Sequence, residues 1–214
     1  MPTIKDARNW YSQNDPVHGY DHIYRVYMLA LRLAESEGAD VEIVKAAVLL
    51  HDINEFHETE LDAQQREEHH IASADFAEKI LSTEGWSKKR IVAVKHCIRA
   101  HRFRSYAERP NTIEAKILFD ADKLDAIGAI GVARAVAYAV RSGQPLFSEV
   151  STKFLETGAK ESEEPHSAYH EYVVKLSKLK RLLYTSEAKR IAEERHSFMK
   201  EFFERLLNEL NGVC

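Results

Sequence analysis

The apolar residues of this chain recur with the period of an α-helix in almost every segment that shows a pattern. One stripe lies between Asp21 and Ser36 and ends at Gly38; its members are Ile23, Val26, Tyr27, Ala30, Leu33 and Ala34. No segment shows a convincing alternation of apolar and polar residues, which is the pattern of a half-buried strand. The sequence therefore predicts an all-α fold.

The same period predicts the remaining helices and one irregular segment. We expect helices over residues 40–51, 70–83, 88–101, 112–123, 127–141, 168–183 and 186–210. Asp40 and Ser87 stand where N-caps are expected. The small residues of "AIGAIGVARAVAYAV" indicate a helix packed closely against its neighbours, and Gly128 and Gly131 suit close packing. Residues 142–165 contain two glycines and two prolines, so we expect a long, partly irregular excursion there.

Length, charge and cysteine content narrow the class of protein. A chain of 214 residues predicts a single domain over residues 1–214. Its net charge of -4 argues against a general nucleic-acid binder. Cys97 and Cys214 form no CxxC pair, the first residues lack the layout of a secretion signal, and no apolar run approaches the length of a membrane span. We expect a cytoplasmic protein without a membrane partner.

The apolar run "AAVLLHDINEF" ends in side chains that can bind a metal or move a proton. On a helix His51 and Glu55 share a face, whereas Asp52 points about 100° around the axis from His51. The simplest alternative is a C-terminal histidine that faces the helix dipole, with a solvated carboxylate beside it. A metal held here needs further ligands from other helices.

Candidates for those ligands interrupt apolar helices elsewhere in the chain. They are His18, His22, His69, His70, His96, His101, Asp120, Asp122 and Asp125. Imidazole and carboxylate together suit a divalent ion such as Mn²⁺, Fe²⁺, Co²⁺, Ni²⁺ or Zn²⁺, and Mg²⁺ is less at home among histidines. The lack of cysteine ligands nearby argues against a structural zinc site. Buried charges of this kind are costly unless a shared cation compensates them.

Three stretches carry a resemblance to a known family. "HGYDHIYRVYMLALRLAE", "AAVLLHDINEF" and "FDADKLDAIGAIGVARAVAY" resemble the HD-domain superfamily of metal-dependent phosphohydrolases, above all its small stand-alone nucleotide phosphohydrolases and pyrophosphohydrolases. The likeness covers about residues 15–141. It implies a compact multi-helix bundle, to which residues 166–210 add C-terminal helices.

The resemblance also implies roles for individual residues. It makes His22, His51, Asp52 and Asp122 the ligands of one metal; Asp122 is preferred to Asp120 and Asp125 because "ADKL" matches the family's last ligand. Asp52 and Glu55 then take the catalytic roles, with Glu55 assisting the attacking water. His70 and His101 match positions that bind a second metal in dinuclear relatives, and a purely structural role for both stays open.

The implied reaction is the metal-dependent hydrolysis of a phosphate ester or anhydride, with a nucleotide or related small phosphorylated metabolite as substrate. Lys123 and Arg104 are the preferred phosphate contacts, Asp125 has a supporting role, and His18 borders the pocket. The alternatives are a dinuclear-iron oxygenase and a non-catalytic nucleotide-sensing domain. The stripe Phe198, Phe202, Leu206 and Leu210 suits either the core or the surface of a homodimer.

Overall fold

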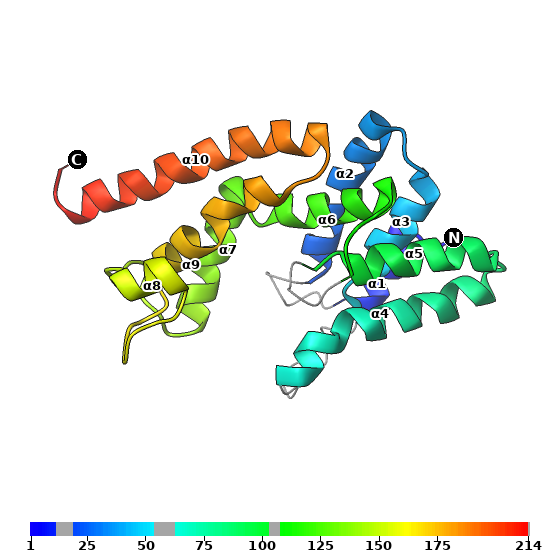
Figure 1. Cartoon of the computed structure of the whole chain (residues 1–214), viewed down its shortest axis with the longest axis horizontal. Coiled ribbons are helices and arrows are strands. Elements are labelled where there is room, and N and C mark those ends of the chain that lie inside the picture. The colour runs from blue at the N-terminus through cyan, green and yellow to red at the C-terminus, as the bar shows by residue number, and fades with distance from the viewer. Residues whose placement is uncertain (12–18, 54–62, 103–107, 214) are drawn as a thin grey trace. The chain divides into compact units, whose positions relative to one another are not determined.

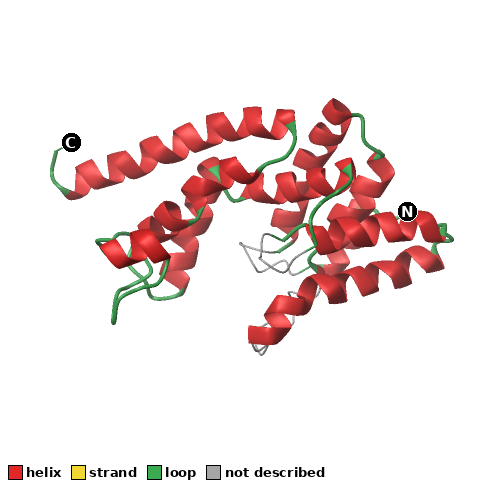
Figure 2. Cartoon of the chain, in the orientation of Figure 1, coloured by secondary structure: helices red, strands yellow, loops and turns green. Residues whose placement is uncertain are grey.

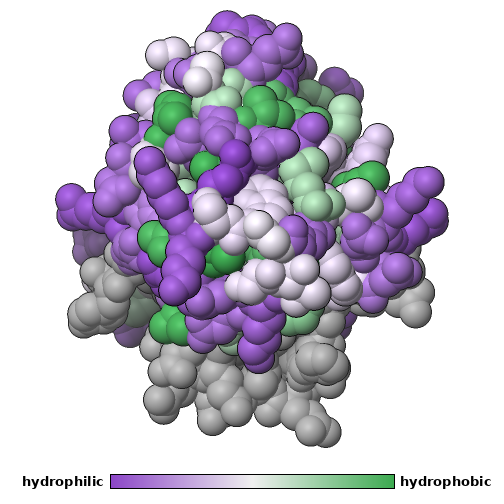
Figure 3. Space-filling model, turned by 90° about the vertical axis from the view of Figure 1, so that its right-hand side faces the viewer, coloured by the Kyte–Doolittle hydropathy of each residue, from purple (hydrophilic) through white to green (hydrophobic). Residues whose placement is uncertain are grey.

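The computed structural model describes residues 1–11, 19–53, 63–102 and 108–213, with only the backbone for 63–69. The all-α prediction is confirmed, since the described residues form helices, turns and loops and include no strand (Figure 2). None of the helices in these ranges is long and apolar enough to cross a membrane. Hydrophilic side chains cover most of the face in Figure 3, where hydrophobic ones lie in small separate patches.

The helices succeed one another along the chain and divide into two compact units (Figure 1). They are α1 (Ile4–Trp10), α2 (Tyr20–Glu37), α3 (Val41–Leu50), α4 (Ala63–Thr83), α5 (Lys88–Ala100), α6 (Ile113–Asp125), α7 (Gly128–Arg141), α8 (Thr152–Thr157), α9 (Ala168–Val174), the 3₁₀ helix η2 (Leu176–Leu182) and α10 (Ser186–Leu210). The first unit comprises Met1–Asp122 with Tyr184–Ala188, and the second comprises Lys123–Leu183 with Lys189–Cys214.

Helix α3 forms the centre of the first unit. It packs against α1, α2, α4 and α5. Its residues Val44, Val48 and Leu50 are fully buried, as expected for a helix that is apolar on nearly every side. The side chain of Asp40 accepts hydrogen bonds from the first backbone N–H groups of the helix, which confirms the predicted N-cap. The packing of α3 therefore fixes where its last residue lies.

In the second unit, α9 packs against α7 and η2, and one of its aromatic rings also contacts α10. Tyr172 stacks on Phe203 with ring centroids 4.3 Å apart, and Phe203 is almost fully buried. The excursion over 142–165 contains the short helix α8. Glu164 ties this excursion together, because it accepts hydrogen bonds from the backbone N–H and the hydroxyl of Ser151 and contacts Nε2 of His170 at 3.1 Å.

Three elements differ from the sequence prediction. Helix α1 was not predicted, although Thr3 and Asp6 form a reciprocal capping box at its start. Helix α4 begins at Ala63, seven residues before the predicted start. The helix predicted over 168–183 is broken at Lys175 into α9 and η2. The expectation of one domain over residues 1–214 stays a prediction.

Candidate metal centre

A buried group of two histidines and one aspartate lies where α2 and α3 meet. His22 belongs to the first turn of α2, His51 caps the C-terminus of α3, and Asp52 follows it. They are 1%, 0% and 5% exposed, respectively. Each offers a ligand atom that lies within 4.8 Å of the other two. Three residues from two distant stretches of sequence thus present nitrogen and oxygen donors to one point.

The distances between these donors fit the edges of a coordination shell. Nε2 of His51 lies 3.3 Å from Oδ2 of Asp52, and Nε2 of His22 lies 3.9 Å from the same oxygen. Oδ1 of Asp122 lies 3.5 Å from Nε2 of His22. Ligands held at about 2.1 Å from a divalent ion stand about 3.0–3.4 Å apart, depending on geometry. His22, His51 and Asp52 therefore fit a divalent cation with small adjustments of their side chains, and Asp122 stands beside His22.

The backbone of α3 fixes the tautomer of His51. Its Nδ1 lies 2.7 Å from the carbonyl oxygen of Val48, which can only accept a hydrogen bond, so Nδ1 carries the proton. In the tautomer with this single ring proton the lone pair is on Nε2, which is buried and has no hydrogen-bond partner among the described residues. A buried nitrogen with an unused lone pair is costly unless it binds a cation or a proton.

His101 extends this arrangement from the end of α5. Its Nδ1 lies 2.6 Å from the carbonyl oxygen of Ile98, and its Nε2 lies 3.3 Å from Oδ1 of Asp52. Burial lowers the pKa of His101, although Asp52 opposes this shift. Asp52 consequently directs one carboxylate oxygen toward His22 and His51 and the other toward His101. When Nδ1 of His51 and of His101 carries the only ring proton, both Nε2 lone pairs face the Asp52 carboxylate. A shared cation would remove this repulsion.

The three aspartates of "FDADKLD" have separate surroundings. The buried Asp120 accepts hydrogen bonds from the backbone N–H groups of Tyr184 and Thr185. Asp125 is also buried, and its Oδ2 accepts from Arg134 at 2.8 Å. The short distance from His22 thus belongs to Asp122, the aspartate that the motif favoured. Its role as a ligand, and the supporting role of Asp125, stay predictions.

The other candidate residues are less well placed by the structure. Glu55, Arg104 and His18 lie outside the described residues. His70 is half-buried on α4, and Lys123 is half-buried directly after Asp122, so their roles also stay predictions.

His96, a weaker candidate, has partners of its own. Its Nδ1 lies 2.5 Å from Oε1 of Glu108, and its Nε2 accepts from the backbone N–H of Asn111. These contacts give His96 a structural role, since they fasten residues 108–111 to α5.

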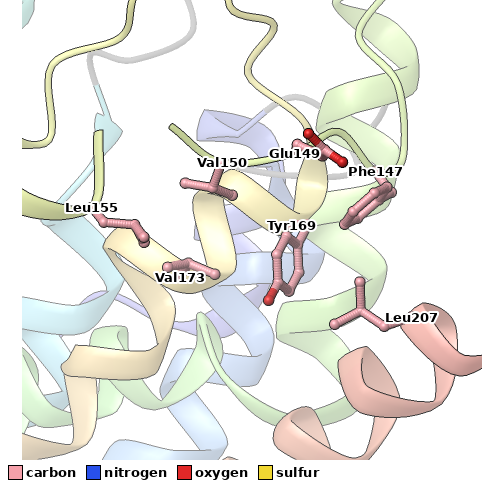
Figure 4. A pocket seen from close by; sticks show the side chains of 7 residues that line it. All are labelled: Phe147, Glu149, Val150, Leu155, Tyr169, Val173 and Leu207. Carbon is pink, nitrogen blue, oxygen red and sulfur yellow. The ribbon is translucent and has the colours of Figure 1, made fainter. Parts of the chain in front are cut away.

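A mostly apolar pocket of about 380 Å³ lies within the second unit (Figure 4). Its walls are formed by Phe147, Glu149, Val150, Leu155, Tyr169, Val173 and Leu207. The ring of Tyr169 lies between Val150, Leu155 and Val173 on one side and Phe147 with Leu207 on the other, and the carboxylate of Glu149 stands at the edge. This pocket offers apolar contact area rather than a group of metal ligands.

Comparison with known proteins identifies the family. The model of the HD domain family matches residues 19–127. The chain is 32% identical to the uncharacterized protein YpgQ of Bacillus subtilis over 199 residues, which cover 92% of this chain and 86% of YpgQ. The crystal structure of YpgQ in complex with ADP superposes with a TM-score of 0.73 at 32% identity, covering 99% of this chain and 100% of that one. A Bacillus thuringiensis HD-superfamily hydrolase has a TM-score of 0.71 at 29% identity, covering 97% and 94%. The chain belongs to the HD-domain family.

Proposed function

We propose that this protein is a metal-dependent phosphohydrolase that cleaves a phosphate ester or anhydride. The observation that carries the proposal is the buried convergence of His22, His51 and Asp52, with Asp122 at 3.5 Å from His22. The orientation of His51 supports it, because its protonated nitrogen faces Val48 and its lone pair faces Asp52. The chain also belongs to the HD-domain family. One of the solved structures similar to it is that of an HD-superfamily hydrolase, which supports hydrolysis as the class of reaction.

His22, His51, Asp52 and Asp122 would hold one divalent cation. Their mixed imidazole and carboxylate donors suit Mn²⁺, Fe²⁺, Co²⁺, Ni²⁺ or Zn²⁺ better than Mg²⁺. When bound, such a cation supplies a Lewis acid that polarises a phosphoryl oxygen and makes water a stronger nucleophile at neutral pH. The walls of the site exclude bulk water, since His22, His51 and Asp52 are all buried.

The chain's own side chains orient the reactants. Asp52 presents two oxygens in different directions, so it can bind through one oxygen and accept a hydrogen bond from water at the other. Glu55 is proposed as the general base or as an outer hydrogen-bond partner, because it follows His51 by four residues. Lys123 and Arg104 are proposed to counter the negative charge of the substrate.

We infer that the substrate is a nucleotide or a related small phosphorylated metabolite. The crystal structure of the relative YpgQ was determined in complex with ADP. This chain aligns with YpgQ over nearly its whole length. The similarity supports a nucleoside polyphosphate as the first class of compound to assay.

The test is a panel of nucleoside mono-, di- and triphosphates assayed with and without Mn²⁺, with released phosphate and pyrophosphate measured separately. The Asp52→Ala variant should lose metal-dependent hydrolysis while its circular dichroism spectrum keeps the helical signal. The Glu55→Ala variant should slow turnover more than it weakens metal binding. Full activity of Asp52→Ala would rule out the mechanism.

A dinuclear centre is the second candidate, because Oδ1 of Asp52 faces Nε2 of His101 at 3.3 Å. A carboxylate that directs its two oxygens to different imidazoles can bridge two cations, with His70 as a further proposed ligand. Metal analysis of protein purified without added metal separates the cases. Two irons per chain together with oxygen consumption would favour oxygenase chemistry over hydrolysis.

A further inference from the structure

Asp122, like His51, lies at the C-terminal end of a helix. It lies in the last turn of α6, which ends at Asp125. The carbonyl groups of a last turn have no partner within the helix, so such turns fray unless other groups bind them. Here the carbonyl oxygens of Lys123 and Leu124 accept hydrogen bonds from the backbone N–H groups of Ala126 and Ile127, and side chains that bind this end add to the hold on the turn that carries Asp122.

Two arginines bind Leu124 and Asp125 at this end, and all four residues belong to the second unit. Nη1 of Arg195, on α10, donates to the carbonyl oxygen of Leu124 at 2.5 Å. Nη1 of Arg134, on α7, donates to Oδ2 of Asp125 at 2.8 Å and lies 3.4 Å from its carbonyl oxygen. Cationic groups at a helix C-terminus satisfy the terminal carbonyls and interact favourably with the helix dipole. Both contacts therefore stabilise the turn that carries Asp122.

The glycines of "AIGAIG" allow these contacts to form. Gly128 has φ of +79°, and a Cβ atom there would lie 2.9 Å from Cγ of Arg195. A Cβ atom on Gly131 would lie 2.3 Å from the carbonyl oxygen of Ala126. Larger residues would push Arg195 aside or open the turn between α6 and α7. The motif thus builds a tight connection next to the end of α6, which refines the close packing predicted for its glycines.

We propose that Arg195 and Arg134 are positioning residues of the metal centre, which hold the last turn of α6 so that Asp122 can bind the cation. This inference rests on the proposed function, because it assumes that Asp122 is a ligand. It adds that residues of α7 and α10, which carry none of the proposed metal ligands, set the affinity of the site. Neither arginine was singled out as a site residue from the sequence, because Arg195 binds a carbonyl group 71 residues earlier in the chain and Arg134 lies on a different helix from Asp125.

The experiment measures Mn²⁺ binding to the full chain by calorimetric titration, so that it does not depend on turnover. Arg195→Met keeps an unbranched side chain over Gly128 but removes the donor to Leu124. Loss of a partner that hydrogen-bonds a ligand directly weakens metal binding by about 10- to 100-fold. Arg195 acts one step further away, through the backbone of Leu124, so we expect a loss of about 10-fold, at the lower end of that range. Arg195→Lys should restore part of the affinity, because its ammonium group can still donate.

A double-mutant cycle with Asp122→Asn separates positioning from general damage. If Arg195 acts through Asp122, adding Arg195→Met to Asp122→Asn should weaken Mn²⁺ binding no further. Arg205→Met is the matched control, since Arg205 lies on the same helix in an exposed pair with Glu209 and should leave binding unchanged. The paired variant Asp125→Asn/Arg134→Gln tests the second arginine without leaving a buried charge unpaired.

The outcomes are distinct. Unchanged Mn²⁺ affinity in Arg195→Met, or losses that simply add in the double variant, would overturn the positioning role and leave the proposed function standing. No Mn²⁺ binding by the unaltered chain would overturn the proposed function and this inference with it.

Discussion

Replacing Asp52 with Asn should have opposite effects on the metal-free and the metal-bound protein. Without metal, the Asp52 carboxylate lies 3.3 Å from Nε2 of both His51 and His101, and the Nδ1 atoms of these rings donate to carbonyl oxygens. An asparagine keeps the shape of the side chain but brings an N–H donor to one of these lone pairs. A net hydrogen bond contributes about 1 kcal/mol, which corresponds to about 2–4 °C for a chain of this size.

With metal, the same substitution removes a charged ligand. An ion present at 100 times its dissociation constant stabilises the folded state by about 2.7 kcal/mol. For a protein of this length that is a rise in Tm of about 5–11 °C. We expect the unaltered chain to show this rise on addition of Mn²⁺ and Asp52→Asn to show almost none of it.

The assay is thermal unfolding followed by circular dichroism, in EDTA and in a series of Mn²⁺ concentrations. Asp75→Asn serves as the control, because Asp75 forms an exposed pair with Lys95 and should respond to Mn²⁺ like the unaltered chain. A fall in the Tm of Asp52→Asn in EDTA, together with a full response to Mn²⁺, would refute the reasoning about the lone pairs and the ligand role of Asp52.

Three further predictions concern stability and reactivity. Asp120→Ala should lower the free energy of unfolding by about 3–5 kcal/mol in urea titrations, because the buried N–H of Thr185 and the partly buried N–H of Tyr184 lose their acceptor. The pKa of Glu164 is lowered to about 2, chiefly by the backbone N–H of Ser151. The contribution of ionised Glu164 to the free energy of unfolding is therefore complete above its ordinary pKa near 4.5 and is lost as the pH falls through about 2. In calorimetry, Glu164→Gln should have a lower Tm than the unaltered chain at neutral pH, and the difference should shrink in acid. Burial raises the pKa of the Cys97 thiol, so in a Cys214→Ser background a disulfide reagent should modify it slowly in buffer and rapidly in urea.

The parts of the fold that sequence could predict are those decided by local pattern. The stripe after Asp21 and the cap at Asp40 depend on neighbouring residues alone, and α2 and α3 were predicted close to their observed bounds. The break at Lys175 could not be found this way. Neither glycine nor proline marks it, and the packing of α9 and η2 overrides the helical period there.

In the candidate site, too, some features follow from local sequence and others only from tertiary packing. The sequence pointed to His22, His51, Asp52 and Asp122. The structure gathers the first three and places Oδ1 of Asp122 3.5 Å from His22, while the ligand roles stay predictions. The separate surroundings of Asp120 and Asp125 depend on Thr185 and Arg134, which no local pattern connects to them. The place of His101 beside Asp52 follows from the packing of α5 on α3, so spacing along the chain could suggest it but not settle it.

The carbonyl groups that hold His51 and His101 have a consequence for the speed of ion capture. Each ring is fastened by the oxygen three residues earlier in the chain, so neither has to search among rotamers when an ion arrives. The side chains of His51 and His101 therefore lose their rotamer entropy when the chain folds and not when the ion binds. Association should then be limited by stripping water from the ion, and slowly dehydrating ions such as Mg²⁺ should enter later than Mn²⁺ even where their final affinities are similar.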